Sequence, residues 1–182
     1  MSKPKVINFK LIDRLTDAEP YAILDKMRDF HGELQEASIV LAWRLRLKSD
    51  KDGHLVLGKC VKASDLQREL SEHDFVILLN RDVWMDPDFT EDKKCALVDH
   101  ELCHAARACD KDGNEKVDNR GRAVWRTRKH DIEEFQVIVK RHGCYKKDLE
   151  RFADELLKKR SAPLFENLAA ESTPAKKPRE VN

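Results

Sequence analysis

The stretch Val98-Asp99-His100-Glu101-Leu102-Cys103-His104-Ala105 decides how the rest of the chain is interpreted. It contains the pattern H-E-x-x-H, inside a segment whose apolar spacing predicts a helix over residues 90–108. Four residues of α-helix advance about 400°, so the imidazoles of His100 and His104 are expected one above the other on a single face. Two imidazoles in this arrangement fit adjacent corners of a tetrahedral metal ion, and zinc is the expected ion.

Glu101 follows the first imidazole and is expected to act as general base on a water held by the metal, without binding the metal itself. This division of roles is typical of peptide hydrolysis. The alternative is a solvated helix whose polar face carries these residues by accident. Apolar neighbours oppose it, because they predict a substantially buried helix: Leu97, Val98, Leu102, Ala105 and Ala106. Unpaired imidazoles and a carboxylate would be costly there, so the pattern favours a metal site.

Composition limits the class of protein. The 182 residues suit one domain with appendages, and 38% of them are charged although the net charge is only +1. Global charge therefore gives no argument for a nucleic-acid or membrane partner, and no apolar run is long enough to span a bilayer. The five cysteines are odd in number and contain no C-x-x-C pair, which predicts reduced thiols in a cytoplasmic protein. Cys103 lies at an x position of the motif, facing away from the histidines, and is not counted as a ligand.

The elements before the motif predict a small sheet with a covering helix. Helical spacing runs over residues 17–36, and strict alternation over residues 38–48 predicts a strand. A turn follows, and residues 54–58 are expected to return as the second arm of a hairpin. Ser64 and Gln67 resemble a capping box that opens a short helix. Residues 74–80 form an apolar run typical of a buried strand. In zinc peptidases with this motif, such a strand commonly forms the rim of the cleft and pairs with extended substrate.

The elements after the motif are expected to be a loop and two helices. The spacing of Asp110, Asp112 and Asn114 is superficially that of a calcium loop, but Gly113 precedes Asn114 instead of following it, and residue 121 is glycine where such a loop needs glutamate. A helix is predicted over residues 129–139, with Thr127 as N-cap and Gly143 as its stop, and a last one over residues 147–160. A disordered tail is expected from residue 161, where Lys176-Lys177-Pro178-Arg179 could touch phosphate or simply be solvated.

A catalytic zinc site needs a third protein ligand. The metzincin extension of the motif is excluded, because it needs glycine and histidine where this chain has Arg107 and Asp110. The predicted second helix offers His130, with Glu134 one turn further along the same face. We favour His130, with Glu134 as the alternative that would make a His-His-Glu site. A helix-start histidine facing water is the remaining interpretation of His130.

Carboxylates that do not bind the metal can orient the N–H groups of the ligand imidazoles. Three acidic residues lie next to the proposed ligands in the sequence and are predicted to do so: Asp99, Asp131 and Glu133.

Several segments together resemble the phage metallopeptidase domain found in phages and prophages. The resemblance covers roughly residues 39–152 and lies in Asp74–Asn80, Trp84, Ala96–Ala105, Lys129–Phe135 and Arg141–Gly143. The pair H-E-L-C-H and H-D-I-E-E-F is far more specific than H-E-x-x-H alone. More distantly, the order of strand, motif helix and later histidine is similar to SprT-like peptidases, which act on proteins bound to DNA. The zinc-ribbon cysteines that many of those proteins carry are absent from this chain.

We therefore expect a compact α+β, zincin-like domain, in which a small, mostly antiparallel sheet packs on the motif helix and further helices. Residues 1–37 form an N-terminal extension with the covering helix, residues 38–160 the metallopeptidase domain, and residues 161–182 the tail. The expected reaction is zinc-dependent hydrolysis of a polypeptide, in the cytoplasm of a bacterial host if the chain is phage encoded.

Two other functions remain open on sequence alone. One is a catalytically silent zinc fold that binds a host protein or nucleic acid. Its phosphate-facing surface would be the densest basic stretch, in which Trp125 is interleaved with Arg120, Arg122, Arg126, Arg128 and Lys129. The other is a metal-dependent hydrolase of a non-peptide amide.

Overall fold

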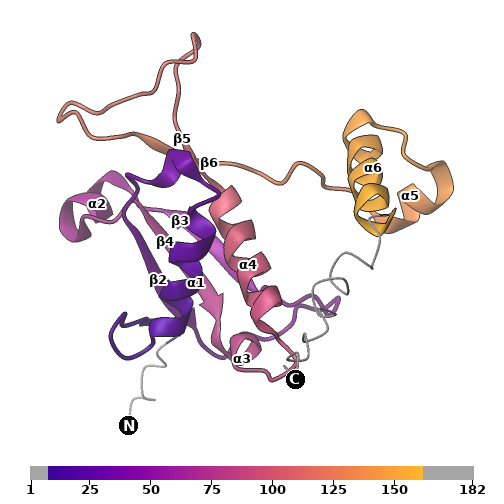
Figure 1. The fold of residues 1–182 in the computed structure, drawn as a ribbon, viewed down its shortest axis with the longest axis horizontal. Helices are drawn as coiled ribbons and strands as arrows, with labels where there is room; N and C mark the ends of the chain where they lie inside the picture. The colour runs from indigo at the N-terminus through magenta and orange to yellow at the C-terminus, as the bar shows by residue number, and fades with distance from the viewer. Residues whose placement is uncertain (1–7, 162–182) are drawn as a thin grey trace, which may run out of the picture. The chain divides into compact units, whose positions relative to one another are not determined.

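The computed structural model describes residues 8–161 and divides the chain between Lys129 and His130 into two compact units (Figure 1). The expected domain boundaries after residues 37 and 160 stay a prediction. The predicted tail, apart from its first residue, lies outside the described residues. The two units are called here the first and the second unit.

The sheet of the first unit has the strand order β1-β2-β4-β3 within the described residues. Strands β2 and β4 are parallel, whereas β1 and β3 pair antiparallel with their neighbours. The fold is therefore α+β with a small, mostly antiparallel sheet, as predicted. The strands are β1 (Phe9–Leu11), β2 (Ile39–Arg44), β3 (Gly58–Lys62) and β4 (Phe75–Asn80).

The expected hairpin between residues 38 and 58 is wrong. Strand β2 ends at Arg44, and residues 54–57 are not a strand. The chain instead enters β3, which pairs with β4 and not with β2. The almost continuous apolar runs of β2 and β4 suit the centre of a sheet, whereas β3 carries Lys59 and Lys62 and suits an edge. Strand β4 is therefore internal, and the rim strand that residues 74–80 were predicted to supply is β3.

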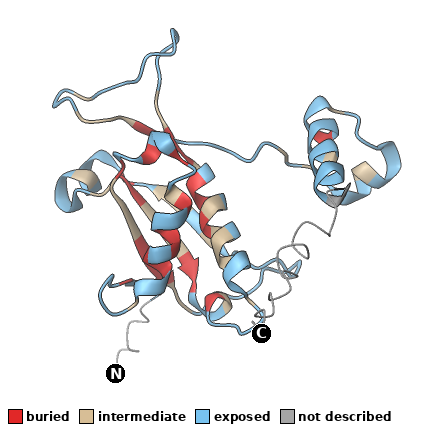
Figure 2. Ribbon diagram, in the orientation of Figure 1, coloured by how far each residue is buried: buried red, intermediate tan, exposed pale blue. Residues whose placement is uncertain are grey.

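Helices α1 (Ala18–Arg28) and α4 (Glu91–Cys103) pack against each other and cover one face of the sheet (Figure 1). Figure 2 shows buried residues where these helices meet the strands. The fully buried side chains include Leu24, Leu41, Phe75, Ile77, Leu79, Val98 and Leu102. Burying an aliphatic or aromatic side chain of this size stabilises a fold by about 1.5–3 kcal/mol. This core therefore holds α4, and the motif with it, in a defined register.

The covering helix is shorter than residues 17–36, because α1 ends at Arg28 and a 3-10 turn follows at Gly32–Leu34 (η1). The Arg28 guanidinium donates hydrogen bonds to the carbonyl oxygens of Leu34 and Gln35, at 3.1 and 2.9 Å. These bonds satisfy carbonyl groups that the interrupted helix leaves open.

Helix α4 ends at Cys103, five residues before its predicted end. The chain then forms β5 (Ala105–Arg107), which pairs antiparallel with β6 (Trp125–Thr127). Within the connection, Asp110 Oδ1 accepts hydrogen bonds from the N–H groups of Asp112 and Asn114, both at 2.9 Å. The spacing that resembles a calcium loop is thus used in a tight turn, and the same arrangement recurs at Asp50.

Two shorter helices flank the central strand β4. Helix α2 (Asp65–Ser71) begins with the predicted capping box, in which Ser64 and Gln67 bond each other reciprocally. Helix α3 (Arg81–Trp84) follows β4 directly, and its Trp84 packs edge-on against Trp43 with ring centroids 5.8 Å apart.

The second unit contains α5 (Gln136–His142) and α6 (Lys147–Ser161). The predicted helix over residues 129–139 is wrong at its start, because residues 128–135 are not helical. The carboxylate of Glu134 explains part of this difference, since it accepts a hydrogen bond from the Phe135 N–H at 3.0 Å just before α5 begins. The predicted stop at Gly143 is confirmed, with a φ of 66°. No helix in residues 8–161 has both the length and the apolar composition that a membrane crossing needs.

Candidate metal centre

The last turn of α4 positions the two histidines of the motif. Val98 and Leu102 are fully buried in the core, which turns the neighbouring face of the helix outward. His104 is the C-cap residue but keeps helical backbone angles, with φ −74° and ψ −21°. The four-residue spacing therefore retains its helical geometry. The rings of His100 and His104 lie with their centroids 5.0 Å apart and their planes at 83°.

A hydrogen bond to the backbone of Arg128, the residue after β6, sets the orientation of the second imidazole. Nδ1 of His104 lies 2.9 Å from the carbonyl oxygen of Arg128, which can only accept, so Nδ1 carries the proton. Nε2 of His104 then carries the lone pair that a metal ion needs. Arg128 also donates its backbone N–H to the His104 carbonyl at 2.8 Å and its Nε to the Cys103 carbonyl at 2.9 Å. These bonds clamp the chain after β6 to the end of α4.

His130 follows this clamp by two residues. One ligand nitrogen from each of His100, His104 and His130 lies within 4.8 Å of the others. The third histidine thus reaches the motif through the β5–β6 pairing and not through a second helix. No sequence signal used above predicts that strand pair.

Glu134, the alternative third ligand, is bound inside the second unit. Its Oε2 lies 2.6 Å from Nζ of Lys146 and also accepts a hydrogen bond from the Tyr145 hydroxyl. The hydrogen bond from Lys146, followed by that from Tyr145, lowers the pKa of Glu134 to about 2. A carboxylate already held by an ammonium group is a poor competitor for a cation.

The acidic residues predicted to orient the imidazoles are placed differently from one another. The carboxylate of Asp99 lies against His31, with Oδ1 2.7 Å from Nε2. Asp131 and Glu133 are exposed in the described part of the chain. The orienting role stays a prediction for all three, and the backbone carbonyl of Arg128 is a partner that sequence reasoning missed.

Glu101 is buried, with 3% of its surface exposed. The backbone N–H of Cys60 donates a hydrogen bond to its carboxylate. Its Oε2 is also buried, and no hydrogen-bond partner for this atom occurs among the described residues. Burial raises the pKa of Glu101, against the opposing effects of the Cys60 N–H and of His104. The Cys60 N–H thus fixes the position of the carboxylate, and Oε2 is available to accept a further hydrogen bond.

Gly58 makes room for this carboxylate. A Cβ atom at position 58 would lie 2.5 Å from Oε1 of Glu101, closer than real side-chain contacts allow. Sequence reasoning did not single out Gly58, although a glycine inside a strand often marks the close approach of another group. The Cys60 thiol is also affected, because burial and the charge of Glu101 raise its pKa to about 12.

A cavity of about 440 Å³ opens beside the motif and is lined by Leu57, Gly58, Phe89, Leu97, His100 and Glu101. Most of its wall is apolar, and the edge strand β3 borders it. The cavity therefore adjoins both His100 and the buried carboxylate of Glu101.

These residues fit a divalent metal ion. Three imidazoles supply neutral nitrogen donors and leave a coordination position open for water, as a catalytic zinc site requires. The spare oxygen of Glu101 suits a hydrogen bond from such a water. A buried carboxylate oxygen without a partner is costly, which favours a bound species in the cavity that Glu101 and His100 line.

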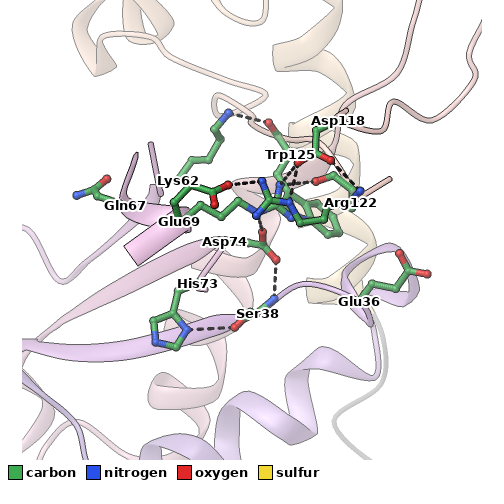
Figure 3. Close-up of polar contacts among 12 residues, drawn as sticks. Glu36, Ser38, Lys62, Gln67, Glu69, His73, Asp74, Asp118, Arg122 and Trp125 are labelled. Atoms are coloured by element: carbon green, nitrogen blue, oxygen red, sulfur yellow. Dashed lines mark hydrogen bonds and ion pairs between the residues drawn. The ribbon is translucent and has the colours of Figure 1, made fainter. Parts of the chain in front are cut away.

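In the basic stretch that begins at Arg120, only some of the positive side chains are exposed without an acidic partner in the described part of the chain. Figure 3 shows Arg122 against Asp118, at 2.7 Å, and its guanidinium also pairs with Glu69 at 2.6 Å. Trp125 is 3% exposed and packs edge-on against Phe75 in the core, so it cannot stack on a base. Arg128 is engaged at the end of α4, as described above. Arg126 and Lys129 are exposed.

Comparison with protein families matches residues 14–157 to the family described as "Putative phage metallopeptidase". The match covers well over half of the chain and includes the three histidines and Glu101. No curated protein and no solved structure matches the chain.

Proposed function

This chain belongs to the phage metallopeptidase family, and from that premise we propose that it is a zinc-dependent peptidase encoded by a phage or prophage. The observation that carries the proposal is a group of three histidine nitrogens within 4.8 Å of one another, one of whose residues, His100, lines the same cavity as the buried carboxylate of Glu101. The five cysteines all lie within residues 8–161 and form no disulfide there, which suits the reducing cytoplasm of a bacterial host. The relation to SprT-like peptidases stays a prediction from the order of elements.

His100, His104 and His130 would hold the zinc ion in this proposal. Zinc bound by three neutral histidines polarises a carbonyl group and lowers the pKa of a bound water. The Arg128 carbonyl keeps the His104 ring in the required tautomer. Glu134 would remain with Lys146 and Tyr145.

Glu101 is the general base. It takes a proton from the attacking water on Oε2 while the Cys60 N–H holds the carboxylate in place, and it then delivers that proton to the leaving amine. Burial moves the pKa of Glu101 toward neutrality, where a general base exchanges protons most effectively. The apolar wall around the carboxylate therefore contributes to its reactivity.

The substrate would lie extended along β3. At the two ends of this strand, Leu57 accepts a backbone hydrogen bond from Asn80 of β4, and Ala63 donates one to Asp74, the residue before β4. In an antiparallel pair these bonds alternate, so the backbone groups of Gly58, Cys60 and Lys62 point away from β4. Glu101 occupies the Cys60 N–H, and the remaining groups can pair with a polypeptide backbone that enters the adjoining cavity.

The test replaces the base by its isostere. Glu101→Gln should retain the bound metal and lose at least about 100-fold in kcat on an unfolded protein substrate, because the amide cannot accept the proton. Asp92→Asn is the matched control, since Asp92 is an exposed carboxylate in the first turn of the same helix. If Glu101→Gln cleaves as fast as the control, Glu101 is not the base. A silent binding module predicts no cleavage by any of these proteins.

A further inference from the structure

A second group of potential metal ligands lies on the neighbouring face of the motif helix. It consists of His31, Asp99 and Cys103, and one ligand atom from each lies within 4.8 Å of the others. This is the same span that encloses the nitrogens of the three histidines described above. We call this group the flanking site.

The register of α4 creates the flanking site. Asp99 and Cys103 are four residues apart, as are His100 and His104, and each residue of the first pair precedes one of the second. The two pairs therefore lie on adjacent faces, rotated by about 100° around the helix axis. One helix segment thus presents two pairs of ligands, each with the spacing that suits a metal ion.

Helix packing brings the third ligand. Because α1 packs against α4, the turn after α1 places His31 over this face, with Nε2 2.7 Å from Oδ1 of Asp99. His31 is 6% exposed, so its ring is held firmly. Its backbone is fixed too: its N–H bonds the Arg28 carbonyl at 2.9 Å, and Arg28 in turn ties down the 3-10 turn.

We propose that His31, Asp99 and Cys103 bind a second zinc ion. Imidazole nitrogen, carboxylate oxygen and thiolate sulfur are all zinc ligands, with bonds of about 2.0–2.3 Å. Ligand atoms around a tetrahedral ion at such distances lie roughly 3.3–3.7 Å apart. The His31–Asp99 contact of 2.7 Å has to widen slightly, which side-chain movement allows. Cys103 binds as thiolate and releases its proton to solvent.

Charge separates the roles of the two sites. Asp99 and Cys103 bring two negative charges, which balance the two positive charges of zinc, whereas three neutral histidines leave the ion's charge uncompensated. With water as its fourth ligand, the flanking ion is therefore a weaker Lewis acid than one held by three histidines, and it joins the last turn of α4 to the turn after α1. This inference goes beyond the proposed function and does not rest on it.

Cobalt provides the test, because a thiolate bound to Co²⁺ gives an intense near-ultraviolet charge-transfer band that nitrogen ligands do not give. The full-length protein should bind two equivalents of Co²⁺ and show this band. Cys103→Ala should bind one equivalent and lose the band. Cys109→Ala is the matched control, since Cys109 is also an exposed cysteine but is not part of the flanking site, and it should keep both equivalents and the band.

His100→Ala separates this inference from the proposed peptidase site. It should bind one equivalent and keep the charge-transfer band, because it removes a ligand of the other ion. One equivalent without a band in the unmodified protein would overturn the flanking site and show that His31 and Asp99 form a plain hydrogen-bonded pair. A band that survives Cys103→Ala would overturn it as well. One equivalent with a band that Cys103→Ala removes would support the flanking site and count against the three-histidine site.

Discussion

At the scale of single residues, the packing of Gly58 against Glu101 makes the site sensitive to one methyl group. Gly58→Ala would place a Cβ 2.5 Å from Oε1 of Glu101, so the carboxylate has to move. We expect kcat to fall at least about tenfold and the free energy of unfolding to fall by about 1–3 kcal/mol. Peptidase assays and urea unfolding measure the two effects. Gly32→Ala is the control, because nothing lies within 4 Å of a Cβ there, and equal losses in both variants would contradict this prediction.

Glu101 should also make the metal-free protein less stable as pH rises. Its folded-state pKa is raised by burial, so the folded state favours the protonated acid. The stabilisation that this gives is complete below the unfolded pKa of about 4.5 and is lost as pH rises through the folded pKa.

Glu101→Gln should therefore raise the melting temperature of the chelator-treated protein at pH 8. The advantage over the unmodified chain should shrink toward pH 4, as measured by thermal unfolding across this range. A constant difference at all pH values would show that burial does not shift this carboxyl group.

The third ligand can be distinguished by two matched substitutions. His130→Ala should lower zinc affinity by at least about 100-fold, because a direct ligand is lost, whereas Glu134→Gln should leave it within about threefold. Competition with a chromogenic chelator measures both affinities. If the Glu134 variant is the one that loses zinc, the His-His-Glu site is correct. Glu134 must then leave its ion pair with Lys146 to bind the metal.

At the scale of elements, the β5–β6 pair joins the core to the metal site. Trp125 on β6 packs edge-on against Phe75, and Arg128 just beyond it holds His104. Trp125→Ala should lower the free energy of unfolding by about 3–5 kcal/mol and weaken zinc binding at the same time. Arg126→Ala changes the exposed neighbour on the same strand and should alter stability by less than about 0.5 kcal/mol. Urea unfolding measures the stability of both variants, and chelator competition measures their zinc affinity. Unchanged zinc affinity in the Trp125 variant would show that the packing of β6 does not support the metal site.

Sequence periodicity predicted the individual elements better than it predicted their pairing. The capping box of α2, the strand at residues 75–80 and the glycine stop at Gly143 follow from local rules, and the structure confirms them. The order of strands in the sheet depends on which apolar runs are covered on both faces. That property belongs to the assembled layers, so the predicted hairpin was wrong although its first strand was right.

At the scale of the whole molecule, the buried core cluster lies within the first unit. Its residues in the described part of the chain run from Ile12 to Trp125. A chain cut after Phe135 keeps this cluster and the three histidines. We expect this truncated chain to unfold cooperatively, as measured by circular dichroism. The truncation is made in the Cys103→Ala variant, so that only the three-histidine site binds zinc. Chelator competition should then show one zinc ion bound with unchanged affinity. Loss of zinc binding on truncation would show that residues after Phe135 are needed for the site.

The sequence by itself determined the chemistry that lies within one helical turn. The spacing of His100, Glu101 and His104 specifies a shared face and an adjacent carboxylate, because helix geometry is set by bonds between residues close in the chain. Only the tertiary structure decided which distant groups join them. The pairing of β5 with β6 brings His130 to the motif, β3 rather than β4 borders the cavity, and His31 meets Asp99 across 68 positions of sequence. These contacts follow from how layers bury apolar surface together, which no local pattern encodes.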